Sequence, residues 1–272
     1  MKYVAFLDIL GFKEKLKAMT HSEARQFIGH FSATAYAVWR DINPSYLKGY
    51  IVSDSFIIYS LDTSQEALIE LVKVTDAICK AEFSRHSIIL RGAISKGEFD
   101  KLEAREMHTL EKGLIVGQAY VDAYLLEGTV KTAGLVLTES VYLDLNDIER
   151  FKKDIFAETD EGTKHHILRY LTLDFLLEEK TIDKFIKLAR DSHWLPHFYN
   201  SLYLALRSET NDKKVHQVFF NIFDVISEGN PSANWQDVDL FIQNAFNENV
   251  FGNFKKRFLK YIRNHIFYQS KS

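Results

Sequence analysis

The order of predicted strands and helices in the first third of the chain is the feature that most constrains its fold. Residues 2–8 are apolar and β-favouring, which predicts a strand buried on both faces. The patterns that follow predict a helix over about 21–40, strands at 47–53 and 55–60, a helix from about 64 to 83 and a strand at 87–95. This β-α-β-β-α-β order predicts an α+β fold of the ferredoxin-like type, with an antiparallel sheet and both helices on one face.

Later segments extend this fold and then change in character. The patterns predict a strand at 114–116, a helix at about 117–127, a strand at 134–137, a helix at 138–145 and a closing strand near 166–172. From about residue 176 helical patterns dominate. We therefore predict two domains, an α+β domain over residues 1–175 and a C-terminal helical region of unknown role over residues 176–272.

The composition is that of a soluble globular protein and argues against several other classes. A formal net charge of −3 argues against a protein that binds nucleic acid through a basic face. The single cysteine, Cys79, lies in an apolar helical pattern, which predicts a buried structural thiol. No apolar run approaches the ~20 residues of a membrane span, and Asp8 comes too early for a signal peptide. We expect a cytoplasmic protein with no membrane partner.

The first motif that could bind a ligand is the segment from Phe6 to Phe12, in which Asp8 ends a predicted buried strand. A short turn containing Gly11 then leads towards a helix. Backbone N–H groups in such a turn can face phosphate oxygens, and the carboxylate can bind a hard cation. The alternative is an aspartate that only caps the next turn.

The second motif is Ser53-Asp54, a predicted hairpin turn between two strands. In a ferredoxin-like sheet this hairpin lies beside the first strand, which would bring Asp54 and Asp8 together. Two carboxylates so close repel each other unless a cation neutralises them. Two metal ions held there can activate a ribose hydroxyl and offset the charge of a triphosphate. The alternative for Asp54 is an ordinary turn aspartate.

Four motifs in this order resemble those of the class III nucleotide cyclases. They are the Asp8 and Asp54 segments taken together, an arginine-led strand at 90–98, a helix begun by Gly117 at 117–127, and a strand and helix at 134–142. The resemblance covers about residues 1–175. It implies a homodimer with active sites shared between two protomers and a nucleoside triphosphate as substrate.

The resemblance also implies roles for individual residues. Asp8 and Asp54 would hold two divalent cations, Mn²⁺ or Mg²⁺, with the Ile9 carbonyl as a further ligand. The backbone of Ile9, Leu10, Gly11 and Phe12 would cradle the β- and γ-phosphates. Arg91 would contact the triphosphate, a task that suits its planar set of donors. The alternative for Arg91 is a surface ion pair.

Several positions depart from the purine-specific members of that family. Tyr50 and Leu114 occupy the two positions that select the base, and Val121 and Leu125 occupy those that usually supply Asn and Arg to the transition state. These changes resemble the pyrimidine cyclases of bacterial anti-phage (Pycsar) systems. A tyrosine at position 50 would narrow the pocket, and its hydroxyl could bond uracil O4 or cytosine N4. It could instead only pack in its strand.

The resemblance therefore implies conversion of UTP, or less favourably CTP, into a 3′,5′-cyclic monophosphate that activates a separate effector protein. The cation that would stabilise the transition state is left open among Lys96, Lys101 and Arg105. One competing hypothesis is a catalytically inactive, cyclase-like module that senses a nucleotide. A further one is a polymerase-like palm that makes oligonucleotides.

Two other segments invite functional interpretations that the pattern does not favour. His165 and His166 lack partners at metal-ligand spacing and are predicted to form an exposed pair at a strand edge. The basic segment 254–263 is predicted to be an amphipathic helix with one solvated face.

Overall fold

The structure, a computed structural model, describes residues 1–102, 114–160, 163–178, 181–192, 196–207 and 211–227. The chain divides into two compact units. The first unit comprises Met1–Val130, Gly134–Ala157 and His165–Tyr170. The second comprises Lys131–Ala133, Glu158–Lys164 and the chain from Leu171 onward.

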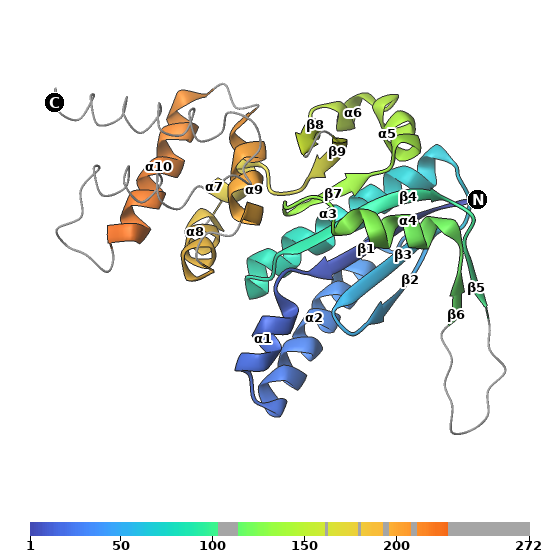
Figure 1. Ribbon diagram of the computed structural model, residues 1–272, viewed down its shortest axis with the longest axis horizontal. Coiled ribbons are helices and arrows are strands. Elements are labelled where there is room, and N and C mark those ends of the chain that lie inside the picture. The colour runs from blue at the N-terminus through green and yellow to red at the C-terminus, as the bar shows by residue number, and fades with distance from the viewer. Residues whose placement is uncertain (103–113, 161–162, 179–180, 193–195, 208–210, 228–272) are drawn as a thin grey trace. The chain divides into compact units, whose positions relative to one another are not determined.

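A seven-stranded sheet organises the first unit (Figure 1). Its strand order is β2-β3-β1-β4-β7-β9-β8. The strands are β1 (Lys2–Ile9), β2 (Leu47–Val52), β3 (Ser55–Ser60), β4 (Leu90–Gly97), β7 (Gly134–Leu137), β8 (Ile155–Asp160) and β9 (Thr163–Arg169). Strand β1 is antiparallel to both β3 and β4, and β2 is antiparallel to β3. These four strands form the predicted ferredoxin-like core, so the predicted fold class is confirmed.

The later strands make the sheet mixed, because β7 pairs with β4 in parallel and with β9 antiparallel. Strand β9 therefore lies inside the sheet, between β7 and β8. The prediction that His165 and His166 form an exposed edge pair is wrong for this reason, since both side chains are buried. The Nε2 atom of His166 lies 3.1 Å from a carboxylate oxygen of Glu139.

Two long helices, α2 (His21–Ile42) and α3 (Gln65–His86), pack together on one face of the sheet (Figure 1). Thr20 begins α2 with a capping box to Glu23, and the Ser64 side chain caps α3 by accepting from the Ala67 amide. Both helices bury apolar side chains against the strands, and Cys79 of α3 is fully buried as predicted. Burial raises the pKa of the Cys79 thiol.

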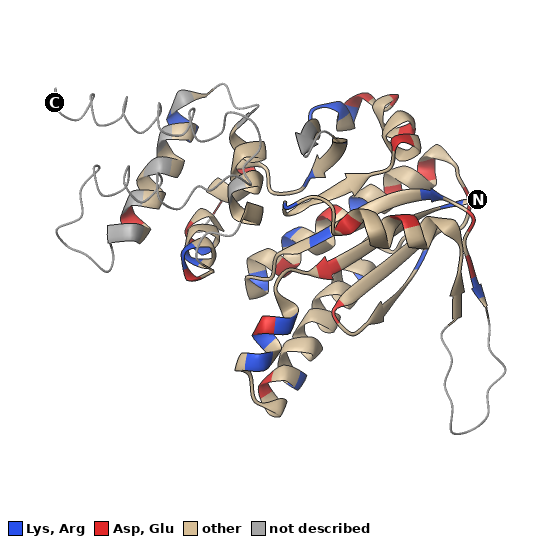
Figure 2. Cartoon of the chain, viewed as in Figure 1, with Lys and Arg blue, Asp and Glu red and all other residues tan. Residues whose placement is uncertain are grey.

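Helix α4 (Gln118–Glu127) lies across β1 and β4 on the opposite face (Figure 1). The remaining elements of the first unit are the helices α1 (Phe12–Ala18), α5 (Glu139–Asn146) and α6 (Glu149–Lys152) and a two-stranded ribbon of β5 (Asp100–Leu102) and β6 (Leu114–Val116). Basic and acidic positions are interspersed along these elements, and α1 carries both signs within two turns (Figure 2).

The described part of the second unit is mainly helical. Its helices are α7 (Leu173–Leu177), α8 (Thr181–Asp191), α9 (Pro196–Arg207) and α10 (Asp212–Ser227). The segment Lys131–Ala133 joins them, because Asn200 of α9 donates to the Lys131 carbonyl and Ser201 accepts from the Ala133 amide. The basic segment 254–263 lies outside the described residues. Within the described ranges, no helix combines the length and the apolar character needed to cross a bilayer.

Gly117 fixes where α4 begins. Its φ of 148° is unfavourable for residues with a side chain, and a Cβ atom there would overlap the Glu98 carbonyl. Gly128, at the other end of α4, has a φ of −74° and open space where a Cβ would lie. Gly117 is thus required by the backbone, whereas Gly128 is not.

We expect Gly117→Ala to lower the free energy of unfolding by about 3 kcal/mol, because the variant must strain or displace the start of α4. Urea unfolding followed by circular dichroism measures this change. Gly128→Ala is the matched control, with an expected effect within about 0.5 kcal/mol. Equal effects of the two substitutions would contradict the structural reason given for Gly117.

Candidate functional site

An aspartate of a strand and an aspartate of a turn meet at one end of the sheet. Asp8 lies near the end of β1 and faces Ser55 across the β1–β3 ladder. Ser53, at a φ of 57°, and Asp54 form the turn between β2 and β3. The Ser55 hydroxyl donates to Asp8 Oδ1 over 3.2 Å, and the Asp54 carboxyl lies close enough to interact directly with that of Asp8. The structure therefore brings Asp8 and Asp54 together.

Electrostatics at this pair are unfavourable without a neutralising charge. Burial raises the pKa of Asp8, and the neighbouring charge of Asp54 raises it further. Arg91 and the Ser55 hydroxyl act in the opposite direction but do not prevent the rise. A cation or a proton between the two carboxylates would relieve their repulsion.

Arg91 lies beside this pair because β4 places it opposite Asp8 in the β1–β4 ladder. Its Nη2 atom is 3.5 Å from Asp8 Oδ2, and its Nε atom forms an ion pair with Glu127 Oε1. The Arg91 side chain is only 25% exposed. Arg91 therefore lies beside the two aspartates in a largely buried ion pair, and its contact with a triphosphate stays a prediction.

Glu127, the last residue of α4, is a site residue that the sequence analysis missed. Its side chain is 8% exposed. Burial raises the pKa of Glu127 to about 7, Asp8 adds to the rise, and Arg91 opposes it. Ala119, Ala123 and Glu127 are spaced four residues apart and are the buried residues of α4. The alignment of this acid with two alanines on one side of the helix is the sequence signal that could have indicated it.

The predicted phosphate-binding turn has one amide already engaged. The Leu10 N–H donates to the Ile89 carbonyl over 2.9 Å. Gly11 adopts a φ of 75° before α1, and Phe12 begins that helix, where the first amides have no acceptor within the helix. The Ile9 side chain is buried, so only its backbone can contribute to a site. Of the four predicted residues, Gly11 and Phe12 are those at the start of α1, where the amides have no acceptor within the helix.

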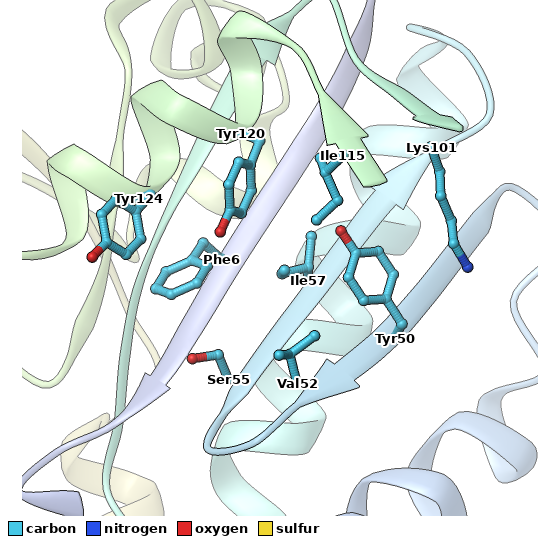
Figure 3. A pocket seen from close by; sticks show the side chains of 9 residues that line it. All are labelled: Phe6, Tyr50, Val52, Ser55, Ile57, Lys101, Ile115, Tyr120 and Tyr124. Atoms are coloured by element: carbon cyan, nitrogen blue, oxygen red, sulfur yellow. The ribbon is translucent and has the colours of Figure 1, made fainter. Parts of the chain in front are cut away.

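A cavity of about 410 Å³ lies on the α4 side of the sheet (Figure 3). It is next to the Asp8–Asp54 pair. Ser55 connects the two features, since it lines the cavity and donates to Asp8. The walls are mainly aromatic and aliphatic, and the lining residues are Phe6, Tyr50, Val52, Ser55, Ile57, Lys101, Ile115, Tyr120 and Tyr124.

Tyr50 directs its hydroxyl into this cavity (Figure 3). Its oxygen is buried and has no hydrogen-bond partner among the described residues. Burial raises the pKa of the Tyr50 hydroxyl, which therefore stays protonated at neutral pH. Leu114 is 46% exposed and is not among the lining residues, whereas Ile115 is. Side chains alternate along a strand, so the wall that Leu114 was expected to form belongs to its neighbour.

The three candidate cations differ in their surroundings. Lys96 forms a 2.7 Å ion pair with Asp144, so its charge is already neutralised. Lys101 lies at the cavity with its Nζ 5.2 Å from the centre of the Tyr50 ring. Arg105 lies outside the described residues. On α4, Val121 and Leu125 are 43% and 63% exposed, and neither carries a polar group.

The two carboxylates suit a hard divalent cation whose coordination is completed by substrate phosphates and water. Among the described residues, no group of three or more His, Cys, Asp or Glu side chains is arranged to hold a metal ion by itself. Asp8 and Asp54 provide two carboxylates, and Mg²⁺ in proteins commonly takes one or two carboxylates together with substrate phosphates and water.

The sequence matches no known protein-family profile and no curated protein. Similar solved structures include the adenylyl cyclase CyaB from P. aeruginosa, with 14% identity over 61% of this chain and 92% of that chain and a TM-score of 0.47. The guanylate cyclase domain of RhGC from Catenaria anguillulae, in complex with GTP, is 14% identical over 61% of this chain and 93% of that chain, with a TM-score of 0.47. A non-canonical dimeric guanylyl cyclase domain of RhoGC from Blastocladiella emersonii is 13% identical over 61% of this chain and 93% of that chain, with a TM-score of 0.47. Similarity of this degree carries no conclusion about the activity of this chain.

The repulsion between Asp8 and Asp54 predicts a stabilising substitution. In EDTA at pH 7, we expect Asp54→Asn to raise the unfolding temperature by about 2 °C. The raised pKa of Asp8 means that stability is lost as the pH rises through it. The gain should therefore shrink as the pH falls and a proton neutralises the pair.

Differential scanning calorimetry between pH 4 and pH 8 measures this effect. Asp147→Asn makes the same chemical change at an exposed position and should leave the unfolding temperature unchanged. A lower unfolding temperature for Asp54→Asn in EDTA would show that the aspartates do not repel each other.

Proposed function

We propose that this protein is a nucleotide cyclase that converts a pyrimidine nucleoside triphosphate, UTP rather than CTP, into its 3′,5′-cyclic monophosphate and pyrophosphate. Two observations carry the proposal: the half-buried pair Asp8 and Asp54, and an aromatic cavity that contains the buried Tyr50 hydroxyl, which has no hydrogen-bond partner among the described residues. The pair suits a divalent cation and phosphates, and the cavity suits a planar ring.

Asp8 and Asp54 would hold two divalent cations, Mn²⁺ or Mg²⁺, with the Ile9 carbonyl as a further donor. When bound, such cations lower the pKa of a hydroxyl and offset charge on a triphosphate. The amides of Gly11 and Phe12 would bind phosphate oxygens at the start of α1. Arg91, with Nη2 directed towards Asp8, would place its guanidinium at the triphosphate.

The reaction is an in-line displacement at the α-phosphorus. The 3′-oxygen of the ribose forms a new bond to that phosphorus as the bond to the bridging oxygen of the leaving pyrophosphate breaks. The proton of the 3′-hydroxyl passes to solvent, so atoms and charge balance. Developing charge on the leaving group requires positive partners, and Arg91 and Lys101 are the described side chains that could supply them.

In a homodimer with shared sites, the base would occupy the aromatic cavity of the protomer opposite the one whose Asp8 and Asp54 hold the cations. A volume of about 410 Å³ falls within the ~300–1,000 Å³ range of small-molecule sites. A protonated Tyr50 hydroxyl can donate to uracil O4 and can accept from cytosine N4, and an unpartnered buried hydroxyl gains most from such a bond. The preference for UTP over CTP follows the resemblance to the pyrimidine cyclases.

A homodimer would complete the site. Several large apolar side chains are exposed on the α4 face and its neighbouring ribbon, namely Leu102, Leu114, Val116, Val121, Tyr124 and Leu125. Exposed apolar groups of this kind favour a second protomer as their cover. In the shared-site arrangement, Asp8, Asp54 and Arg91 of one protomer face the partner's Tyr50.

The same proposal extends to the setting of the protein. Residues 1–175 would form the catalytic domain of a cytoplasmic enzyme. Its cyclic product would activate a separate effector in anti-phage defence. Residues 176–272 would form an additional helical region with a role outside the chemistry.

A cyclase-like module that senses a nucleotide without converting it is the second candidate. It is favoured by the exposed aliphatic side chains of Val121 and Leu125 on α4, which cannot stabilise a transition state. Retention of both aspartates at a site where they repel each other favours the enzyme, because a purely structural pair would be costly to keep.

Incubation with each of the four ribonucleoside triphosphates and Mn²⁺, followed by mass spectrometry, distinguishes these functions. We expect cyclic UMP and pyrophosphate from UTP, and at least about a 100-fold loss of activity in Asp54→Ala, because that variant loses half of the cation site. Asp147→Ala is the control and should retain full activity. Four unchanged triphosphates would favour the sensor, and oligonucleotide products would favour a polymerase-like activity.

A mixing experiment tests the shared site. Asp54→Ala and Tyr50→Ala should each be inactive alone, because each homodimer lacks one half of both sites. Equal mixing with subunit exchange should restore up to about a quarter of the wild-type activity, since half of the dimers then carry one intact site. No recovery, with heterodimers demonstrated by native mass spectrometry, would place Tyr50 and Asp54 in the site of one protomer.

A further inference from the structure

Arg91 lies between two carboxylates, those of Glu127 and Asp8. Its Nε atom forms an ion pair with Glu127 Oε1, while its Nη2 atom lies 3.5 Å from Asp8 Oδ2, which is longer than a direct charge-assisted hydrogen bond. An unrestrained arginine beside two carboxylates would form a bidentate pair with one of them. Glu127 therefore draws Arg91 away from the carboxylate that it would otherwise neutralise.

The position of Glu127 is set by close packing of α4 against β4. A Cβ atom at Gly97 would lie 3.3 Å from the Ala119 amide nitrogen, so the helix and strand backbones approach closely there. The Ser95 hydroxyl donates to the Ala119 carbonyl at the same point. Two turns further along the same buried side of α4, the Glu127 carboxyl reaches Arg91. The strand and the helix thus hold both partners of the ion pair.

We propose that Glu127 is a positioning residue that withholds Arg91 from Asp8 and so leaves the Asp8–Asp54 pair available to a divalent cation. This inference rests on the proposed function, because it assumes that the pair binds a cation. Glu127 acts through Arg91 and touches neither the cation nor the nucleotide. With Glu127 neutralised, the guanidinium turns to Asp8 and competes with the cation for it.

Mn²⁺ binding without nucleotide tests this role and needs no turnover. Free Mn²⁺ is counted by electron paramagnetic resonance during titration of the full-length protein. We expect Glu127→Gln, which keeps the shape of the side chain, to weaken Mn²⁺ binding about tenfold. Arg91→Met should bind Mn²⁺ at least as tightly as the wild type, because the competing guanidinium is gone.

A double-mutant cycle separates positioning from a direct effect of charge. Loss of the Glu127 charge also weakens cation binding by simple electrostatics, but that effect would persist without Arg91. If Glu127 acts through Arg91, then Glu127→Gln has little effect on Mn²⁺ affinity in the Arg91→Met background. Equal losses in both backgrounds would overturn the proposal. Glu149→Gln, an exposed change of the same net charge, should leave Mn²⁺ affinity unchanged.

A second substitution protects the test against a folding defect. Glu127→Asp keeps the charge but shortens the reach, and it should give the same dependence on Arg91. Full wild-type affinity in Glu127→Asp, with Arg91 present, would show that the reach to Arg91 is irrelevant and would overturn the proposal. Thermal unfolding of each variant identifies those that are folded.

The outcomes also separate this inference from the proposed function. Normal Mn²⁺ binding and a non-additive cycle, with no cyclic product from any triphosphate, would sustain the role of Glu127 and overturn the cyclase. A cyclic product together with an additive double-mutant cycle would sustain the cyclase and overturn the role of Glu127. Absence of Mn²⁺ binding by the wild-type protein would overturn the role of Glu127.

Discussion

The repulsion between Asp8 and Asp54 is the interaction on which the rest of the site depends. Both are held near each other by the pairing of β1 with β3, and burial makes the pair more costly than it would be in water. Two nearby polar groups offset part of this repulsion: the Ser55 hydroxyl through a hydrogen bond to Asp8, and Arg91 through its positive charge. Arg91 in turn is shared with Glu127, so the neutralisation is incomplete. An incompletely neutralised pair of carboxylates is what a cation-binding site requires before its cation arrives.

The α4 face supplies the other half of the arrangement. Close backbone packing at Gly97 and Ala119 positions the helix, and its buried side ends in Glu127. Tyr120 and Tyr124 of the same helix line the cavity and pack edge-on against Phe6 of β1. One helix therefore shapes both the electrostatics at Asp8 and the aromatic surface beside it. A displacement of α4 would affect both at once.

Much of the core could be predicted from the sequence because its elements are local. The order of the first six elements follows from apolar periodicity, and the positions of Asp8 and Asp54 follow from where strands end. Strand order is not local, so neither the parallel pairing of β7 with β4 nor the interior place of β9 could be predicted. The same limit hid the burial of His165 and His166.

Some residues near the aspartates could be placed from the sequence, and others could not. The place of Arg91 beside the aspartates was predicted but that of its partner Glu127 was not, because an acid at a helix end is usually solvated and only its alignment with Ala119 and Ala123 indicates otherwise. The strand at 114–116 was predicted correctly, and Leu114 was predicted to contact the nucleotide base, but Ile115 is the residue that lines the cavity. In a strand a shift of one residue exchanges the two faces.

The division of the chain into units has a consequence for how it can be shortened. The second unit begins with Lys131–Ala133, far ahead of its helices in the sequence. Asn200 donates to the Lys131 carbonyl over 2.6 Å, and the Ala133 amide donates to Ser201 over 2.8 Å. A truncation after Tyr170 would remove both partners and leave two backbone groups of the retained chain without their hydrogen bonds. The segment Lys131–Ala133 therefore depends on α9 for its hydrogen bonds although it precedes β7 in the sequence, and a cut at the apparent boundary would damage the part that is kept.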